Sequence, residues 1–305
     1  MASVSPYSMS VAGSPATSCR KNAVWSEMRA ACCMLWVTMM IVISGASSAI
    51  DLTLHDALTA FVTDDMELAR RAKKKTYKID ARCANLEAVC YNLIATQSPV
   101  ASDFRLLQTI IYIDFNLQRM SDKVRRIARA AKRKVNNDIE FPPQMVALIE
   151  QEAASVYQVL GSTAAALVNN DLAAVLALSE EDEAVHGAYQ EFFRVFNRTE
   201  TMEVADDAQM DDFRRTVMVS RYLDRIAGIS MECAYRLVFL LTGQRLSAVD
   251  IAEADEEELE GMRIPSGEGV TLDPASDARY VAALAPDEVG AELAALIADA
   301  IAEGE

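Results

Sequence analysis

The chain has 305 residues, of which 51% are hydrophobic and 24% charged, with only 11 Gly and 8 Pro. This composition excludes a wholly disordered chain, and the abundant Ala, Leu, Met and Glu predict an all-α fold. The net charge of −16 lies mostly in residues 251–305, which hold 15 acidic and 2 basic residues. Acidity of this kind disfavours binding to nucleic acid or to anionic lipid.

The N-terminal part contains two unlike segments. Residues 1–25 are rich in Ser without periodicity, and we expect a disordered extension. Residues 30–50 carry no charge and contain Ser-Ser-Ala at 47–49. Taken alone, this run is typical of a secretory signal cleaved after Ala49, or of a marginal membrane span. We favour a soluble first helix instead, because cleavage there would expose a core that the second half of the chain keeps covered.

An internal repeat organises the chain. AFVTDDMELA at 60–69 aligns with ALVNNDLAAV at 166–175, and NLQRMSD at 116–122 aligns with YLDRIAG at 222–228, both at an offset of 106 residues. A constant offset at two places indicates a duplication. We expect one three-helix repeat within residues 26–138 and a second within 139–246.

Helical spacing of apolar residues places six helices in these repeats. The expected ranges are 36–62, 64–95, 101–134, 142–168, 170–197 and 206–243. Their ends carry suitable residues: TDD and NND offer N-caps, FPPQ places Pro in a first turn, and Gly243 follows the last apolar stretch. The sequence therefore predicts two tandem three-helix bundles.

Two basic runs lie in the first repeat, at residues 70–75 and 119–134. On neighbouring helices they would form a basic surface for an acidic partner or for the chain's own tail. That tail, residues 247–305, is expected to be a flexible acidic linker with a short terminal helix. Apolar residues recur there at helical spacing: Leu293, Leu296, Ile297 and Ile301.

Residues suited to catalysis are scarce. The six cysteines, at positions 19, 32, 33, 83, 90 and 233, form no CxxC pair and have no His at zinc-ligand spacing. We interpret them as reduced, buried residues. The two histidines, His55 and His186, lie near no plausible Ser or Cys nucleophile motif. The sequence therefore does not favour catalysis by a histidine side chain.

Two segments resemble a known family. TQSPVASDFRLLQTIIYIDFNLQRMSDKVRRIARAA at 96–131 is similar to the third helix of the PhoU family, and SRYLDRIAGISMECAYRLVFLLTG at 220–243 is similar to the matching helix of that family's second repeat. The positions that carry the family signature are Gln97, Pro99, Asp103, Arg105, Arg119 and Arg225.

The resemblance implies a function through protein contacts. PhoU-like proteins are non-enzymatic regulators of phosphate uptake, so no catalytic or cofactor-binding residues are expected. The implied partners are the ATPase subunit of a phosphate ABC transporter and a membrane sensor histidine kinase, with the phosphate-starvation response kept off when phosphate is plentiful. The resemblance also implies a cytoplasmic protein that lies close to the membrane surface through its partners. A homodimer is a further expectation.

Some family members bind iron or zinc through an E(D)-x-x-x-D motif on the third helix of each repeat. Here Gln118 replaces the first acid while Asp122 is kept, and Asp224 is kept while Gly228 replaces the second acid. A hard cation needs several oxygen ligands, so we expect no metal cluster. The alternatives are a helical iron or zinc protein using Asp122 and Asp224 with Asp114, or, less favoured, an exported helical protein.

Overall fold

The computed structural model describes residues 47–97, 99, 101–198, 207–247, 250–251 and 254–264. A first helix covers residues 47–63. The further helices are α2 (Met66–Gln97), α3 (Ala101–Asn136), α4 (Pro143–Asn169), α5 (Leu172–Arg198), α6 (Asp207–Thr242) and the short α8 (Glu256–Gly261). No strand occurs in these ranges, so the predicted all-α fold is confirmed. The expected N-terminal extension, most of the apolar run and the expected terminal helix lie outside the described residues.

The capping residues that the sequence predicts are found at the starts and ends of the helices. Asp65 accepts a hydrogen bond from the backbone N–H of Leu68 at 2.9 Å, and Asp171 accepts one from Ala174 at 3.0 Å, so each caps the start of a helix. Pro143 occupies the first turn of α4, where its missing N–H is tolerated. Gly243 follows α6 with φ of 75°, the left-handed conformation typical of a residue just past a helix end.

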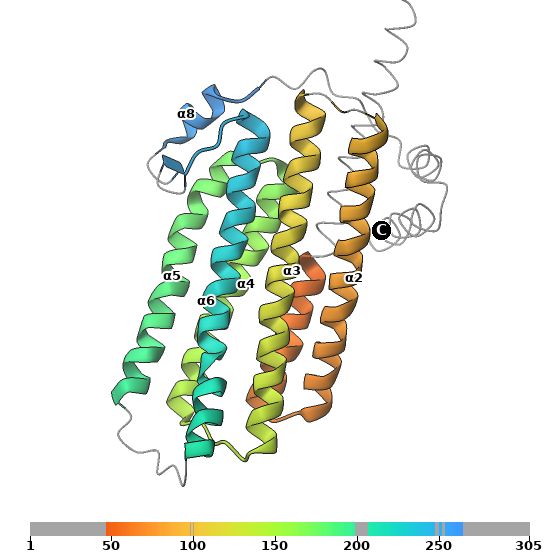
Figure 1. The fold of residues 1–305 in the computed structure, drawn as a ribbon. Helices are drawn as coiled ribbons and strands as arrows, with labels where there is room; N and C mark the ends of the chain where they lie inside the picture. Colours follow the sequence, from red (N-terminus) through yellow and green to blue (C-terminus); the bar gives the residue numbers. More distant parts are fainter. Residues whose placement is uncertain are drawn as a thin grey trace, which may run out of the picture.

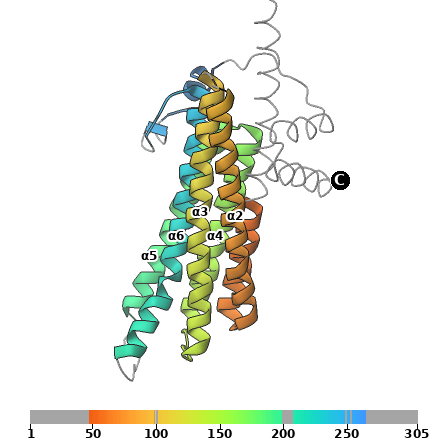
Figure 2. The same ribbon diagram turned by 45° about the vertical axis from the view of Figure 1, so that its right-hand side comes forward.

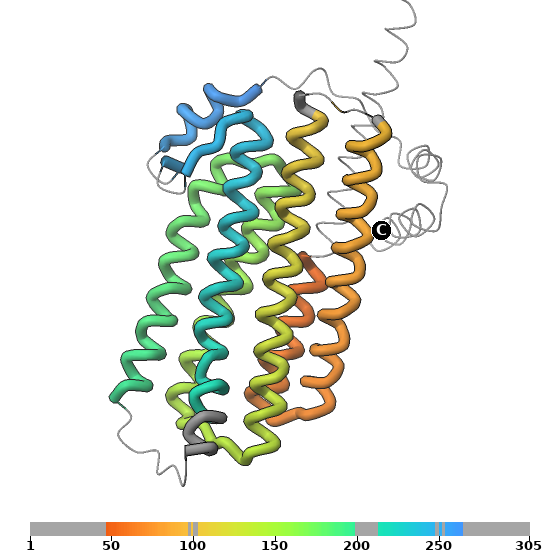
Figure 3. Tube along the Cα trace, viewed as in Figure 1, coloured from red at the N-terminus to blue at the C-terminus, as the bar shows by residue number. Residues whose placement is uncertain are grey.

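The bundle is elongated, and successive helices alternate in direction (Figures 1 and 3). In Figure 1, α5, α6, α3 and α2 stand side by side, with α4 and the helix at 47–63 behind them. Turning the molecule by 45° keeps α3 beside α6 and α2 (Figure 2). Contacts between elements agree: α2 packs on α3, α4 packs on α5 and α6, and α3 packs on α6. The third helices of the two repeats therefore join one continuous core.

The first part of the expected acidic tail is packed against the bundle. Ile251 and Leu259 are fully buried, Asp255 caps α8, and α8 packs on α5. The expectation of a flexible linker from residue 247 is therefore wrong for the described residues up to 264. Two apolar side chains among the acids supply enough buried surface to hold this segment.

The two basic runs do lie on neighbouring helices, but many of their charges are paired. Arg125 binds Asp80 at 2.6 Å, Lys75 binds Asp56 at 2.6 Å and Lys134 binds Asp64 at 2.6 Å. These ion pairs leave much less free positive charge on α2 and α3 than the sequence indicates.

Candidate functional site on the sister helices α3 and α6

A buried polar cluster lies between α2 and α3. Asp114 is 1% exposed, and its Oδ2 accepts a hydrogen bond from Gln118 Nε2 at 3.1 Å. Burial raises the pKa of Asp114 to about 6, while contacts with Cys83 and Gln118 lower it and the charge of Glu87 raises it. Burial and the charge of Asp114 also raise the pKa of Cys83. The thiol therefore stays protonated at neutral pH and cannot act as a metal ligand without losing its proton.

Asp122 is surrounded by cations of its own helix. Its carboxylate accepts a hydrogen bond from Arg126 Nε at 2.8 Å and lies 3.6 Å from Arg125 and 3.7 Å from Lys123. Burial opposes ionisation, but the hydrogen bond from Arg126 and the three positive charges outweigh it and lower the pKa of Asp122. The charge that a metal would need from Asp122 is already neutralised.

A second cluster joins α4, α5 and α6. Asp224 lies 3.1 Å from His186 Nδ1, while Glu152 on α4 is fully buried and neither of its carboxyl oxygens has a hydrogen-bond partner in the described structure. Burial raises the pKa of Glu152 to about 8, while Ser220 lowers it and the nearby charge of Asp224 raises it. Burial and Asp224 also raise the pKa of Asp182, against the effect of His186. At neutral pH Glu152 is mostly protonated.

The sequence analysis missed Glu152. Its spacing from Met145, Ile149 and Val156 places it on the apolar face of its helix, and all three of these residues are buried. An acid in the middle of an apolar stripe was therefore the signal that could have identified it. Asp182 and His186 could not be linked to Asp224 in this way, because they come from another helix.

The two clusters do not fit the metal chemistry of the resemblance. Within the described part of the chain, no group of three or more His, Cys, Asp or Glu side chains is arranged to hold a metal ion. Asp122 pairs with Arg126, whereas Asp224 contacts His186. Gln118 donates its hydrogen bond to Asp114, and Gly228 has no side-chain atom that could bind a metal. A metal role for Asp122 and Asp224 stays a prediction that only metal analysis can test.

Two signature residues of α3 connect it to α6, Arg105 near the start of the helix and Arg119 at its middle. Arg105 lies against Gly243, and Arg119 Nη1 binds Glu232 Oε2 at 2.6 Å. Asp103 lies in the first turn of α3, where a negative charge is favourable. The other three signature positions are Gln97 at the end of α2, Pro99 between α2 and α3, and the exposed Arg225 on α6. Arg105 and Arg119 thus contact residues of the second repeat and help to hold the two repeats together.

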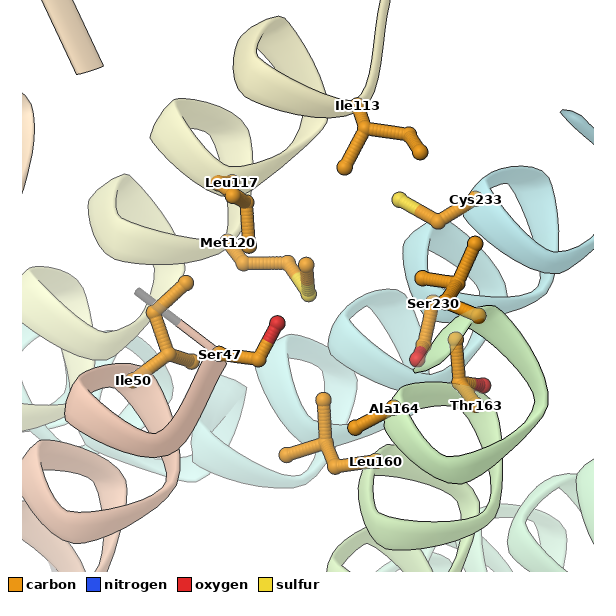
Figure 4. Close-up of a pocket in the computed structure, with 11 residues that line it drawn as sticks. Ser47, Ile50, Ile113, Leu117, Met120, Leu160, Thr163, Ala164, Ser230 and Cys233 are labelled. Carbon is orange, nitrogen blue, oxygen red and sulfur yellow. The ribbon is translucent and has the colours of Figure 1, made fainter. Parts of the chain in front are cut away.

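A small cavity lies between the helix at 47–63, α3, α4 and α6 (Figure 4). Its volume is about 10 Å³, room for about one water molecule, and its wall is mainly apolar. Leu117, Leu160 and Cys233 are among the residues that line it. Pockets for small molecules are far larger, so this cavity is no substrate site.

The fold and these clusters define a class: an all-helical protein of two tandem three-helix units, joined through sister helices, with buried acids whose pKa values are raised by burial. Among the described residues, no helix is both long and apolar enough to cross a membrane.

Comparisons with known proteins narrow this class. The family model described as "PhoU domain" matches residues 43–131. The phosphate-specific transport system accessory protein PhoU of Serratia marcescens is 27% identical over 213 residues, covering 70% of this chain and 83% of that protein. Residues 43–131 thus match the PhoU domain, and the chain is similar to PhoU accessory proteins over most of their length, as the sequence motifs predict.

Solved structures agree on the fold. The crystal structure of PhoU from Pseudomonas aeruginosa superposes with a TM-score of 0.60 at 20% identity, covering 73% of this chain and 99% of that one. The phosphate transport system regulatory protein PhoU from Streptococcus pneumoniae gives a TM-score of 0.60 at 20% identity, covering 70% and 97%. Both relatives are matched over almost their whole length, so the likeness includes both repeats.

Proposed function

We propose that this protein is a non-enzymatic regulator of phosphate uptake and of phosphate-starvation signalling. It acts by contact with the ATPase subunit of a phosphate ABC transporter and with a sensor histidine kinase, and it represses the response when phosphate is plentiful. The observation that carries the proposal is similarity to a named accessory protein of phosphate-specific transport over 83% of that protein's length.

The site geometry supports action by contact. The buried acids Asp114 and Glu152 lie inside the bundle, where no substrate can reach them, and the cavity beside α3 is too small for one. The described thiols Cys83, Cys90 and Cys233 are buried, and burial raises the pKa of each, so none is an activated nucleophile. What the molecule offers a partner is its long helical surface.

The test is recovery of partners from cells of the source organism. The full chain carrying an affinity tag is expressed at its native level, and bound proteins are identified by mass spectrometry from phosphate-replete and phosphate-starved cultures. We expect the transporter ATPase, the sensor kinase or both, with an amount that changes with phosphate. Absence of both in both conditions would contradict the proposal. A tagged unrelated helical bundle of similar acidity controls for capture by charge alone.

A chromosomal deletion gives an independent readout. Loss of the protein should switch on a phosphate-starvation reporter in replete medium, and the wild-type gene on a plasmid should restore repression. Repression that is unchanged in the deletion strain would exclude a negative regulatory role.

Metal analysis separates this proposal from the alternative of an iron or zinc protein. Protein purified without chelator is measured by elemental analysis, with Asp122→Ala and Asp224→Ala beside the wild type. We expect no stoichiometric metal. Metal that is present at one equivalent or more and lost in either variant would favour the alternative.

A further inference from the structure

A strip of arginine and aromatic side chains runs along the surface where α3 meets α6. We define the arginine–aromatic strip as Tyr112, Phe115, Arg119, Arg236, Phe239 and Arg245. Neighbouring members contact one another: the Arg236 guanidinium lies 4.0 Å from the Tyr112 ring centre and 5.1 Å from that of Phe239, and Arg245 lies 5.7 Å from that of Phe239. Arg119 lies 5.9 Å from the centre of the Phe115 ring. Both repeats build the strip, and Glu232 on α6 links its two groups by accepting hydrogen bonds from Tyr112 and Arg119.

The strip has positive charge that the described chain does not neutralise. Arg119 is paired with Glu232. Arg236 and Arg245 have no carboxylate within salt-bridge distance in the described residues, and Nε of Arg236 is buried without a hydrogen-bond acceptor. Burial and the neighbouring charge of Arg245 lower the pKa of Arg236. Because neither guanidinium has a carboxylate partner among the described residues, a ligand that brings carboxylates to their exposed N–H groups would be stabilised here.

The strip also exposes apolar surface. Phe115 is 59% exposed, and Tyr112 and Phe239 are partly exposed. Aromatic and arginine side chains together are the composition of the energetically important centres of protein interfaces. The strip thus fits an occupant that presents an apolar stripe flanked by acids.

The chain itself continues from the end of this strip. The backbone N–H of Ile264 donates to the carbonyl of Leu241 at 2.9 Å, and the Ile264 side chain lies beside Gly243 and Arg105. The segment 265–305 therefore follows a residue that lies in space beside the end of α6, close to Arg245. This segment holds nine acidic residues and one basic residue, Arg279. Apolar residues at helical spacing lie among these acids: Val289, Leu293, Leu296, Ile297 and Ile301.

We propose that residues 287–303 of the same chain dock along the arginine–aromatic strip as an amphipathic acidic helix. The apolar stripe packs on Tyr112, Phe115 and Phe239, and the flanking carboxylates pair with Arg236 and Arg245. This proposal does not depend on the proposed function.

Length and attachment favour this occupant. A helix of 17 residues spans about 25 Å, which matches about 16 residues along α6. A flexible linker of the length of residues 265–286 would have an end-to-end distance of about 25 Å, enough to lay the helix back along α6. Tethering gives an effective concentration of about 1 mM, so even a weak helix–strip contact would be populated. A small anion could use the arginines but not the exposed rings.

The experiment uses the full chain with the photo-crosslinking residue p-benzoylphenylalanine in place of Phe115. After irradiation, digestion and mass spectrometry should map the cross-link to residues 287–303 in a monomeric product. The matched control places the same residue at Leu52, which is 63% exposed on the helix at 47–63, outside the strip. We expect the cross-link to this segment from position 115 at about ten times the yield from position 52, consistent with a populated tethered contact.

Two sets of variants test the charge pairing. R245E changes an exposed end of the strip, and the combined change E288Q, E292Q, D299N and E303Q leaves the bundle untouched. Each should lower the cross-link yield at least about fivefold, and 1 M salt should do the same. The control K74E reverses an exposed charge on α2 and should change nothing.

Several results would overturn the proposal. They are a cross-link yield that is equal at positions 115 and 52, a yield unchanged by the four tail substitutions, or cross-links only between two copies of the chain. If inorganic phosphate still binds the strip after residues 265–305 are deleted, the strip is a small-anion site instead. Because the tail variant does not alter the folded bundle, loss of folding cannot explain its effect.

Discussion

Gln118 donates a hydrogen bond from its Nε2 to Oδ2 of the buried Asp114, one helical turn away on α3, at 3.1 Å. An acid at position 118 would place an acceptor opposite this acceptor and a second negative charge beside a group that is 1% exposed. The amide that interrupts the family motif therefore has a structural reason in this chain. It stabilises a buried carboxyl that lies outside the motif.

Gln118→Glu should therefore destabilise the protein. The loss of the donor and the added charge should lower the free energy of unfolding by about 1–3 kcal/mol at pH 8. The loss should shrink at pH 5, where both carboxyls can hold a proton. Urea unfolding at the two pH values measures the difference, and the exposed Gln158→Glu on α4 is the control. Equal losses at both pH values would contradict the assigned hydrogen bond.

Glu152 predicts a pH dependence of stability. Its pKa is raised from 4.5 to about 8 in the folded protein. The folded state therefore binds the proton more tightly than the unfolded state does. The resulting stability is fully present below pH 4.5 and is lost as the pH rises to about 8, by at most about 5 kcal/mol. Glu152→Gln cannot titrate, so it should remove this part of the pH dependence.

The measurement is urea unfolding between pH 5 and pH 8.5 for wild type, Glu152→Gln and the control Glu150→Gln. Glu150 lies on the same helix but is exposed. We expect the stability gain of Glu152→Gln over wild type to grow with pH, and Glu150→Gln to follow the wild type. Parallel curves for Glu152→Gln and wild type would show that the carboxyl is not buried in solution.

Most of the fold could be predicted from the sequence because its determinants are local. Apolar spacing and caps such as Asp65 and Asp171 fix helix positions to within a few residues from α2 to α6, and the constant offset of 106 residues reveals the repeat. The ion pair between Asp122 and Arg126 is also local, since the two lie four residues apart. It could have been predicted, and it argues against Asp122 as a free ligand.

The rest depends on contacts between distant residues. Asp224 meets His186 across 38 positions, and Asp182 is influenced by the same two residues. Nothing in the local pattern shows that Lys134 is paired while Arg236 is not. Charge that looks equal in the sequence is therefore paired at Lys75, Arg125 and Lys134, whereas Arg236 and Arg245 have no carboxylate partner among the described residues. Only the packing of the helices decides which arginines remain available.

Lys134 should be a stabilising residue. It is 6% exposed, and its ammonium donates to the Phe61 carbonyl at 3.1 Å and to Asp64 Oδ1 at 2.6 Å. It thereby ties the end of α3 to the turn before α2, where Asp64 has φ of 57°. Lys134→Met keeps a buried aliphatic side chain but removes the N–H donors of the ammonium group. It should lower the free energy of unfolding by about 1–3 kcal/mol. Lys74→Met, at an exposed position on α2, should change it by less than about 0.5 kcal/mol.

Gly243 and Gly228 should respond in opposite directions to the same substitution. Gly243 has φ of 75°, and an added Cβ would lie 3.0 Å from Nη1 of Arg105 and 3.1 Å from Cδ1 of Ile264. Gly243→Ala should therefore destabilise the protein by about 1–2 kcal/mol. Gly228 lies inside α6 with no atom within 4 Å of the added Cβ, so Gly228→Ala should stabilise it by about 0.5–1 kcal/mol.

Thermal and urea unfolding of both glycine variants, measured beside the wild type, test this pair. The contrast matters because Gly228 stands where the family motif has its second acid. Open space there means that a side chain is tolerated, so the glycine is not required by packing. If Gly228→Ala were as destabilising as Gly243→Ala, the surroundings of Gly228 on α6 would be more crowded than the structure shows, and a packing role for that glycine would have to replace this interpretation.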